Sequence, residues 1–219
     1  MDERAEINGL TKSALRVARR LVILGGGESG VGAALLAKQK GYDVFLSDAG
    51  SLKEVYRNAL NVEGIEWEEG KHSEERILSA DEIVKSPGIP EKNELVKQIR
   101  KKGISVISEI EFAYRYAGES KIIAITGSNG KTTTTSLIYH ICKTGDLNAA
   151  LVGNIGESFA KQVAMDPKPV YVVEISSFQL DDIIEFRPHI AVLTNITEDH
   201  LDRYDYNFEN YIKSKFRII

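Results

Sequence analysis

The sequence predicts an α/β fold made of two consecutive domains, each built around a parallel sheet. Short apolar runs alternate with helical patterns along most of the chain, which is typical of parallel strands joined by right-handed crossovers. A glycine-rich turn, 25–30, follows the first apolar run, and a second glycine loop, 127–130, follows a later one. A helical pattern comes after each loop, so both domains begin with a strand–loop–helix unit.

The first domain is expected over 20–118, after an N-terminal extension, 1–19, that lacks the apolar stretch of a secretory signal. Its strands are expected at Arg20–Leu24, Asp43–Ser47, Glu82–Lys85 and Ser105–Ile107. Its helices are expected to end at Lys40, to span Leu52–Leu60 and Asn93–Lys102, and to run from Ser108 to Ala117. Ser108 and Glu111 have the spacing of a capping box, which predicts where the last of these helices begins.

The second domain is expected over 119–219, beginning at the polar break Gly118-Glu119-Ser120. Its strands are expected at Lys121–Thr126, Ala149–Val152, Tyr171–Glu174 and His189–Leu193, and its helices at Lys131–Thr144 and from about Asn207 onward. The last helix reaches Ile219 without a cap or a closing strand, so we expect this domain to be truncated.

Composition excludes several classes of protein. The 219 residues are 42% hydrophobic and 27% charged, as in ordinary globular domains. A net charge of −4 and a pI near 5.7 disfavour a nucleic-acid partner. The chain has no apolar run of the roughly 20 residues that a membrane span requires. The single cysteine, Cys142, cannot form an intrachain disulfide and is interpreted as a small core residue. We expect a cytoplasmic monomer.

The loop after the strand Lys121–Thr126 is the strongest functional signal. Its backbone N–H groups and the following helix N-terminus can hold phosphates, Lys131 can reach the β/γ oxygens, and Thr132 can bind Mg²⁺. The residues expected to bind nucleotide are Gly127, Ser128, Asn129, Gly130, Lys131, Thr132 and Thr133. The loop departs from the general Walker spacing, because Ile125 stands where that pattern has its first glycine. The alternative is an ordinary glycine turn whose threonine caps a helix.

The first glycine loop fits the pattern G-x-G-x-x-G. Asp48 ends the next strand, 21 residues past Gly27 (48 − 27), where a dinucleotide-binding fold has its ribose carboxylate. Ser86-Pro87-Gly88 ends a further strand at the same edge of the sheet. This pattern indicates a Rossmann-like domain that binds a nucleotide. It leaves open a structural glycine turn, and a nicotinamide dehydrogenase.

Two further strand ends in the second domain carry groups that suit metal binding. Glu174 ends an apolar strand beside the phosphate loop, where P-loop NTPase-like domains place an acidic Mg²⁺ ligand. His200 lies among three acids and an arginine in the loop 194–203, which makes it a candidate for a second metal. Each residue could instead be an exposed side chain at a strand end.

The final helix places a lysine among apolar residues. At 100° per residue, Phe208, Tyr211, Ile212 and Ile219 share a face, and Lys215 lies in the middle of it. Lys213 and Arg217 are expected to point toward solvent. A lysine on a buried face either extends to the surface or has a task, because burial lowers its pKa and frees the amine for modification.

These residues together resemble the Mur ligases of peptidoglycan synthesis. The phosphate loop has that family's form, including its departure from the Walker spacing. Three segments resemble the D-glutamate-adding branch of the family in particular, namely Gly153-Asn154-Ile155-Gly156, the run 174–180 and the run 195–204. The resemblance extends from about Arg20 to the last residue.

The resemblance implies ATP- and Mg²⁺-dependent amide formation through an acyl phosphate, with UDP-N-acetylmuramoyl-L-alanine and D-glutamate as substrates. It implies that Lys131 and Thr132 bind the nucleotide phosphates and Mg²⁺. Thr132 and Glu174 would hold the first Mg²⁺, and His200 the second together with Lys215, at the position of the family's carbamylated lysine. Asn154, Ser176 and Gln179 would line the muramoyl-alanine end, and Ser29, Asp48, Ser86 and Gly88 the UDP end. The D-glutamate pocket would lie in a further domain, so this fragment alone is expected to be inactive.

Two other interpretations compete with the D-glutamate-adding Mur ligase. Another Mur ligase, or a folylpolyglutamate synthase-like ligase, would share the phosphate loop but not the segment Ser176-Ser177-Phe178-Gln179-Leu180. A non-catalytic module that binds UDP-sugars would describe this fragment if it folds by itself. Binding of UDP-muramoyl-alanine, ATP with Mg²⁺, or NAD would distinguish these classes.

Overall fold

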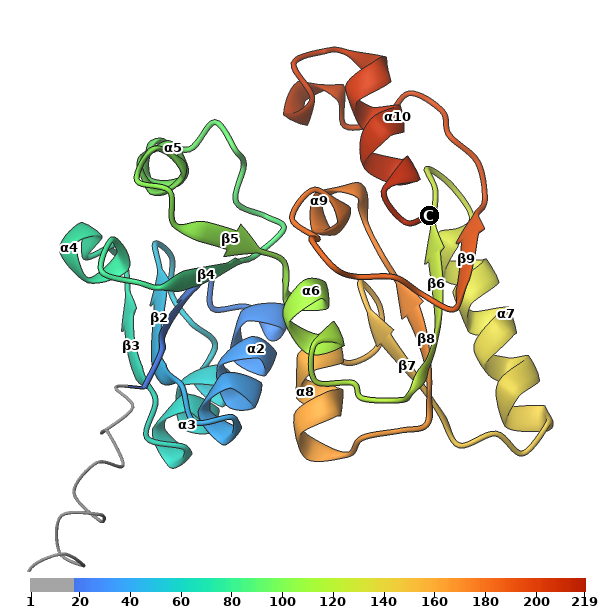
Figure 1. The fold of residues 1–219 in the computed structure, drawn as a ribbon, viewed down its shortest axis with the longest axis horizontal. Coiled ribbons are helices and arrows are strands. Elements are labelled where there is room, and N and C mark those ends of the chain that lie inside the picture. Colours follow the sequence, from blue (N-terminus) through green and yellow to red (C-terminus); the bar gives the residue numbers. More distant parts are fainter. Residues whose placement is uncertain (1–17) are drawn as a thin grey trace, which may run out of the picture.

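The computed structural model describes residues 18–219 and contains two parallel α/β sheets that lie side by side (Figure 1). This arrangement confirms the α/β class, with a Rossmann-like sheet followed by a second parallel sheet that carries the phosphate loop. The extension expected over 1–19 falls outside the described residues except for its last two.

The first sheet has the strand order β3-β2-β1-β4-β5, and all neighbouring strands are parallel. Its strands are β1 (Arg20–Leu24), β2 (Asp43–Asp48), β3 (Glu66–Glu69), β4 (Glu82–Lys85) and β5 (Ser105–Ile107). Its helices are α2 (Glu28–Gln39), α3 (Glu54–Val62), α4 (Glu74–Ile77), α5 (Glu94–Lys101) and α6 (Glu109–Tyr114). Since β1 is central, the loops after β1, β2 and β4 meet at one edge of the sheet, where ligands of such folds bind.

The second sheet has the order β7-β8-β6-β9 and is also parallel. Its strands are β6 (Lys121–Thr126), β7 (Ala149–Gly153), β8 (Val170–Glu174) and β9 (Ile190–Leu193). Its helices are α7 (Lys131–Thr144), α8 (Phe159–Met165), α9 (Ser177–Leu180), α10 (Phe208–Phe216) and the 3₁₀ turn η1 (Leu201–Arg203). Because β6 lies between β8 and β9, the loops after these three strands converge at their carboxyl ends.

The sequence pattern does not predict five of these elements, namely β3, α4, α8, α9 and the 3₁₀ turn η1. Strand β3 reads Glu-Trp-Glu-Glu and pairs only with β2, so it forms a polar sheet edge without the apolar alternation of a strand. The three helices have four to seven residues, fewer than two helical turns. Such segments are too short to show a 3.6-residue period.

Helices α2, α6 and α8 pack between the two sheets (Figure 1). A continuous hydrophobic core includes Leu36 of α2, Phe112 of α6 and Phe159 of α8, each fully buried. A Cβ on Gly32 would lie 2.0 Å from Ser158 Oγ, so this glycine lets α2 approach the start of α8. The two domains therefore share one core rather than meeting through a wet surface.

Buried carboxylates also join the domains. Glu111 is completely buried and accepts hydrogen bonds from the backbone N–H groups of Ile184, Glu185 and Phe186, at 2.9 to 3.0 Å. The sequence predicted that Glu111 would complete a capping box with Ser108. Only half of that box forms, with the Glu111 N–H donating to Ser108 Oγ, because the carboxylate turns to the second domain instead.

Helix α10 buries Tyr211 and Lys215 on the expected face, with Phe208 and Ile212 half-buried beside them, but its end differs from the prediction. Tyr211, Ser214, Lys215 and Ile218 are buried, whereas Ile219 is 71% exposed. The prediction for Ile219 is wrong, because the last helical residue is Phe216 and the period no longer applies beyond it. Arg217 is exposed, as expected, and its guanidinium also donates to the carbonyl oxygens of Leu180 and Ile183.

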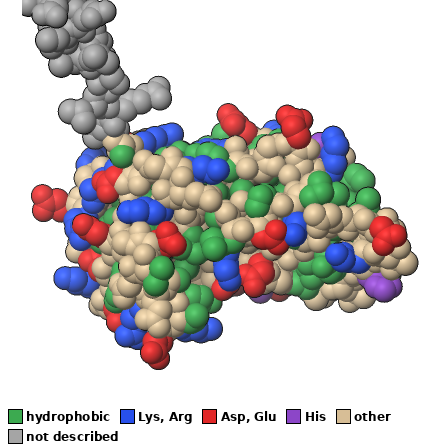
Figure 2. All heavy atoms as spheres, turned by 90° about the horizontal axis from the view of Figure 1, so that it is seen from below, with side chains coloured by type: hydrophobic (Ala, Val, Ile, Leu, Met, Phe, Trp, Pro, Cys, Tyr) green, Lys and Arg blue, Asp and Glu red, His purple; other side chains and the backbone are tan. Residues whose placement is uncertain are grey.

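The molecular surface mixes charges of both signs. Figure 2 shows basic and acidic side chains interspersed over one face of the molecule. Cys142 is 6% exposed and packs in a small cluster around α7, as expected for a core residue. Among the helices of the described residues, none combines the length and apolarity needed to cross a bilayer.

Candidate functional site

The loop between β6 and α7 has the geometry of a phosphate cradle. Gly127 has φ +146°, and a Cβ there would lie 1.9 Å from Thr194 Oγ1 in the neighbouring loop. Gly130, in the left-handed conformation, is the N-cap of α7 and has no side chain to occupy the first N–H groups of the helix. Lys131 Nζ donates to the carbonyl oxygens of Gly127 and Ser128, both at 2.9 Å, so the ammonium lies over the loop.

A hydroxyl and a carboxylate meet beside this loop. Thr132 Oγ1 donates to Glu174 Oε2 at 2.8 Å, and Asn154 Nδ2 donates to Glu174 Oε1 at 2.9 Å. Glu174 is 2% exposed, so both of its oxygens are held in place at the end of β8. Oxygen ligands of this kind suit Mg²⁺, which typically takes one or two protein carboxylates and completes its shell with phosphates and water.

Lys215 reaches the same loop from α10. Its side chain is 2% exposed, and Nζ donates to the Gly127 carbonyl at 2.7 Å. Burial, and next the nearby Lys131 cation, lower the pKa of the Lys215 amine to about 8. The inward direction predicted for Lys215 is thereby confirmed. The lowered pKa makes much more of the amine neutral near pH 7 than in an exposed lysine, while the protonated form still predominates.

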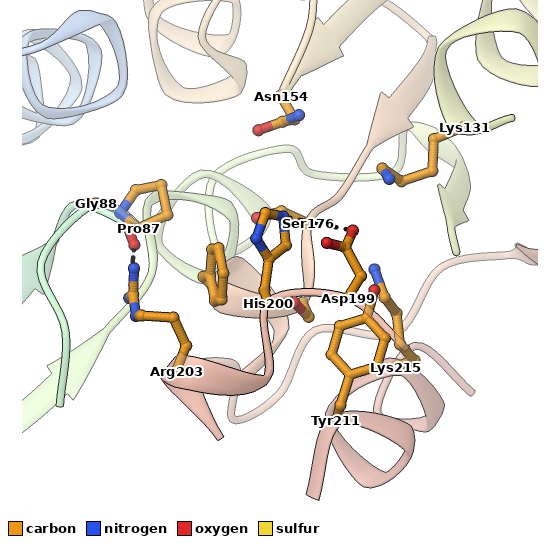
Figure 3. A pocket seen from close by; sticks show the side chains of 12 residues that line it. Pro87, Gly88, Lys131, Asn154, Ser176, Asp199, His200, Arg203, Tyr211 and Lys215 are labelled. Carbon is orange, nitrogen blue, oxygen red and sulfur yellow. Dashed lines mark hydrogen bonds and ion pairs between the residues drawn. The ribbon is translucent and has the colours of Figure 1, made fainter. Parts of the chain in front are cut away.

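A cleft of about 250 Å³ lies in front of these groups (Figure 3). The cleft is lined by five of the thirteen residues predicted to have roles in the second domain, namely Lys131, Asn154, Ser176, His200 and Lys215. The first domain contributes Pro87 and Gly88 from the turn after β4. The cleft therefore lies where the carboxyl edges of the two sheets face each other.

His200 stands at the mouth of this cleft. Its φ of +50° is unusual for a non-glycine residue, and strained backbone of this kind clusters at functional sites. Its side chain is 56% exposed, and Nε2 lies 3.5 Å from Asp199 Oδ2. Within residues 18–219, no three His, Cys, Asp or Glu side chains are grouped closely enough to hold a metal by themselves. Phosphate oxygens would have to complete any metal site here.

The residues expected to bind UDP lie at the edge of the first sheet. Asp48 Oδ2 accepts from the Gly26 N–H and Oδ1 from the Gly50 N–H, so this carboxylate already ties two loops together. Asp48 and Gly88 line a second cavity of about 190 Å³, and Gly88 also lines the larger cleft. The two cavities therefore adjoin at Gly88.

Other predicted residues do not line either cavity. Gln179 is 2% exposed, and its Oε1 accepts from the Ser176 N–H, which completes a capping box at the start of α9. Gln179 thus holds Ser176, which does line the cleft. Ser29 and Ser86 are partly exposed at the sheet edge, and Thr133 is exposed on the first turn of α7.

Three cleft residues were not assigned roles from the sequence. Tyr211 O–H and Ser128 Oγ are 3.0 Å apart, which joins α10 to the phosphate loop. Arg203 stacks 4.2 Å over the Phe178 ring and donates to the Pro87 carbonyl of the first domain at 3.0 Å (Figure 3). Phe178 and Arg203 belong to the runs 174–180 and 195–204, and Tyr211 belongs to the last helix, but the partners of these residues are too distant in sequence for a local pattern to reveal them.

Comparisons with known proteins agree with this geometry. Residues 19–108 match the family model described as Mur ligase MurD-like, N-terminal domain, and residues 125–219 match the Mur ligase middle domain. The chain belongs to the Mur ligase family. The UDP-N-acetylmuramoylalanine–D-glutamate ligase of Bacteroides fragilis is 60% identical to this Mur ligase chain over 200 residues, and that of Chlorobaculum parvum is 43% identical over 201. These matches cover 91% and 90% of this chain but 45% and 43% of the relatives, so the chain spans less than half of their length.

Solved structures confirm the fold of this Mur ligase chain. The UDP-N-acetylmuramate:L-alanyl-gamma-D-glutamyl-meso-diaminopimelate ligase of Neisseria meningitides superposes with a TM-score of 0.60 at 22% identity, covering 92% of this chain and 68% of that one. The UDP-N-acetylmuramate-alanine ligase of Thermotoga maritima superposes with a TM-score of 0.57 at 22% identity, covering 91% and 46%. At this level of identity the likeness concerns the fold alone.

Proposed function

We propose that the whole protein is an ATP-dependent ligase of peptidoglycan synthesis. By the whole protein we mean a chain of the relatives' length that contains these residues. It would add D-glutamate to UDP-N-acetylmuramoyl-L-alanine. The observation that supports this most directly is one cleft lined by Lys131 and buried Lys215 together with Pro87 and Gly88 of the first domain. The Thr132–Glu174 pair lies beside it, at the start of the helix that Lys131 opens. Relatives up to 60% identical have this ligase's name.

In this proposal the phosphate loop positions ATP. The γ-phosphoryl group moves to the alanine carboxylate, giving an acyl phosphate and ADP, and the amino group of D-glutamate then displaces inorganic phosphate as the amide forms. Lys131 Nζ, already at the loop carbonyls, would turn to the β/γ oxygens, while the N–H groups at the start of α7 bind them. Thr132 and Glu174 would hold a Mg²⁺ that neutralises charge on the phosphates.

The muramoyl-alanine end would lie along the second domain's strand ends. Asn154 and Ser176 line the cleft with donor groups that can orient the acceptor carboxylate. Gln179 would act through Ser176, because its side-chain oxygen accepts hydrogen bonds from the backbone N–H and the hydroxyl of Ser176. The UDP group of the substrate would then extend past Gly88 to the edge of the first sheet, where Ser29, Asp48 and Ser86 are the proposed contacts.

Lys215 and His200 would serve the second metal site. The buried amine, with a pKa of about 8, is suited to react with CO₂ when neutral, forming an N–C bond and releasing a proton. The resulting carbamate replaces a buried cation with an anion that can bind a metal ion. Both side chains line the same cleft. We assign D-glutamate to no residue of this chain, and we place the reaction in the cytoplasm with a monomeric enzyme.

The test is a matched pair of lysine variants in the whole protein. Lys131→Ala should abolish ATP-dependent amide formation, since losing charge stabilisation of a transferred phosphoryl group typically costs several kcal/mol of barrier. Lys143→Ala, at the exposed end of the same helix, is the control. UDP-substrate binding should persist in both variants. A Lys131→Ala enzyme within tenfold of the parental rate would rule out this loop as the phosphate cradle.

The competing hypothesis, a nicotinamide dehydrogenase, has its own test. Calorimetry on the 219-residue chain should detect UDP, while NAD should give no heat of binding. Micromolar NAD binding with no response to UDP would favour the dehydrogenase and overturn the proposal.

A further inference from the structure

The smaller cavity, at the edge of the first sheet, has an unusual lining for a nucleotide site. Its walls include Asp48, His72, Ile89, Pro90 and Asn93. Among the described residues that line it there is neither lysine nor arginine. The larger cleft, in contrast, is lined by Lys131, Arg203 and Lys215. Phosphates suit the cationic cleft, and an uncharged planar ring suits the cavity between Ile89, Pro90 and the polar edge.

A chain of hydrogen bonds fixes which nitrogen of His72 carries a proton. Ser47 Oγ lies 2.7 Å from both Glu68 Oε1 and His72 Nδ1, and Ser47 is fully buried. Burial raises the pKa of Glu68, but hydrogen bonds from Ser73 and Ser47 outweigh this and leave it below its ordinary value. Glu68 is therefore ionised and can only accept.

The hydroxyl hydrogen of Ser47 has to point at an acceptor. Its two other neighbours, the Glu68 carboxylate at 2.7 Å and the Lys71 carbonyl at 3.5 Å, both lack a proton to donate. Toward His72 the hydroxyl must then be the acceptor, so Nδ1 carries the hydrogen. In neutral His72, which lines the cavity, the remaining nitrogen, Nε2, is a hydrogen-bond acceptor.

The orientation of Asn93 is fixed by a similar argument. Asn93 is the N-cap of α5, and its side-chain oxygen accepts from the N–H groups of Leu95 and Val96 at 2.9 and 3.4 Å. Only the oxygen of an amide can accept, so the NH₂ group is the part left for the cavity. The cavity therefore presents one acceptor, from His72, and one donor, from Asn93.

We propose that His72 and Asn93 read the base of a uridine nucleotide. His72 Nε2 accepts the N3–H of the uracil ring, and Asn93 Nδ2 donates to the neighbouring C4 carbonyl. Cytosine has an acceptor at N3 and an amino group at C4, so it would set acceptor against acceptor and donor against donor. Ser47 and Glu68 act as positioning residues that hold the His72 tautomer. This inference rests on the proposed use of a UDP-linked substrate.

The experiment compares UDP with CDP by isothermal titration calorimetry on the 219-residue chain. A matched donor–acceptor pair on a base edge typically discriminates by about ten- to a hundredfold, and the unmodified chain should prefer UDP by that factor. Asn93→Asp keeps the capping oxygen but replaces the donor with an acceptor, so it should shift the preference toward CDP by at least about tenfold. His72→Ala should weaken UDP binding more than CDP binding.

Two further variants separate base reading from stability. Ser47→Ala should lower the UDP preference without removing any group that touches the nucleotide. His140→Ala, an exposed histidine on α7, should change neither affinity. Thermal melts of each variant show whether the fold is retained, and His72→Ala provides the test if Asn93→Asp fails to fold.

The outcomes distinguish this inference from the proposed function. If the chain binds UDP and the UDP-to-CDP ratio is unchanged in His72→Ala and Asn93→Asp, base reading by these residues is overturned while the ligase proposal stands. If the unmodified chain binds no UDP, both the inference and the proposed UDP site fail. A lower ratio of UDP to CDP affinity in His72→Ala, together with a shift toward CDP in Asn93→Asp, supports base reading by these two residues.

Discussion

A buried ion pair between the two domains gives the sharpest prediction about stability. Lys85 Nζ of β4 lies 3.0 Å from Asp182 Oδ2, in the segment after α9, and both side chains are at most 3% exposed. Arg100 contacts the other carboxylate oxygen, but its side chain is 40% exposed. Replacing Asp182 with alanine would leave the Lys85 cation buried without its main partner.

The size of this effect follows from the contacts that remain. Breaking a buried pair by removing one partner costs about 3–5 kcal/mol. Lys85 keeps Glu91 at 3.1 Å and the Ile89 carbonyl at 3.1 Å, which places the loss near the lower end of that range. The exposed Arg100 contact adds at most about 1 kcal/mol, because solvent screens it. We expect Asp182→Ala to lower the free energy of unfolding by about 3 kcal/mol.

Urea unfolding of the 219-residue chain measures this directly. The control is Asp166→Ala. The Asp166 carboxylate is 62% exposed, so losing its ion pair with Lys168 should change stability far less than Asp182→Ala does, because solvent screens that pair. Since the two domains share a core, both variants should unfold in one transition. Equal losses in the two variants would refute the reasoning, as would two separate transitions in the unmodified chain.

Two remaining predictions concern buried titratable groups. Burial raises the pKa of Glu109 from 4.5 to about 7, so the folded chain binds this proton more tightly than the unfolded chain and stability falls as pH rises from about 4.5 through 7. Glu109→Gln should flatten this pH dependence of the free energy of unfolding, by at most about 3 kcal/mol between pH 5 and 8 in urea titrations. The control is Glu119→Gln, at an exposed position. If Glu109→Gln leaves the pH dependence unchanged, the assignment is contradicted. In the whole protein, Lys215→Ala should lower turnover at least about a hundredfold, and acetate, but not bicarbonate, should restore part of it. Normal turnover of Lys215→Ala in a steady-state assay would exclude a carbamate at this position.

The sequence predicted those parts of the fold that are set by local patterns. The bounds of β1, β4, β5, β6 and α7 agree with the structure to the residue. For β1 and β6 the reason is local, because an apolar run that ends at a glycine loop leaves few alternatives. Strand β3 escaped prediction, since an edge strand paired on one side does not need apolar alternation. Lys215 was placed correctly because its helix has a clear buried face.

Contacts between distant segments could not be predicted in this way. Glu111 has the spacing of a local cap, yet its carboxylate binds backbone N–H groups more than 70 residues away. Gln179 was expected to touch substrate and instead caps α9. In both cases a local pattern is compatible with several partners, and the tertiary fold decides which partner lies within hydrogen-bond reach.

The interface between the domains is itself part of the proposed binding site. The cleft draws Pro87 and Gly88 from the first domain and its other lining residues from the second. Its shape therefore depends on how the domains are held, by the shared core, by Glu111 and by the Arg203 contact to the Pro87 carbonyl. A substrate that contacts both sheet edges binds more tightly when the distance between the two domains is already fixed. The domains then lose no conformational entropy when the substrate binds. The buried carboxylates at this interface, which have no role in chemistry, thus support function by fixing that distance.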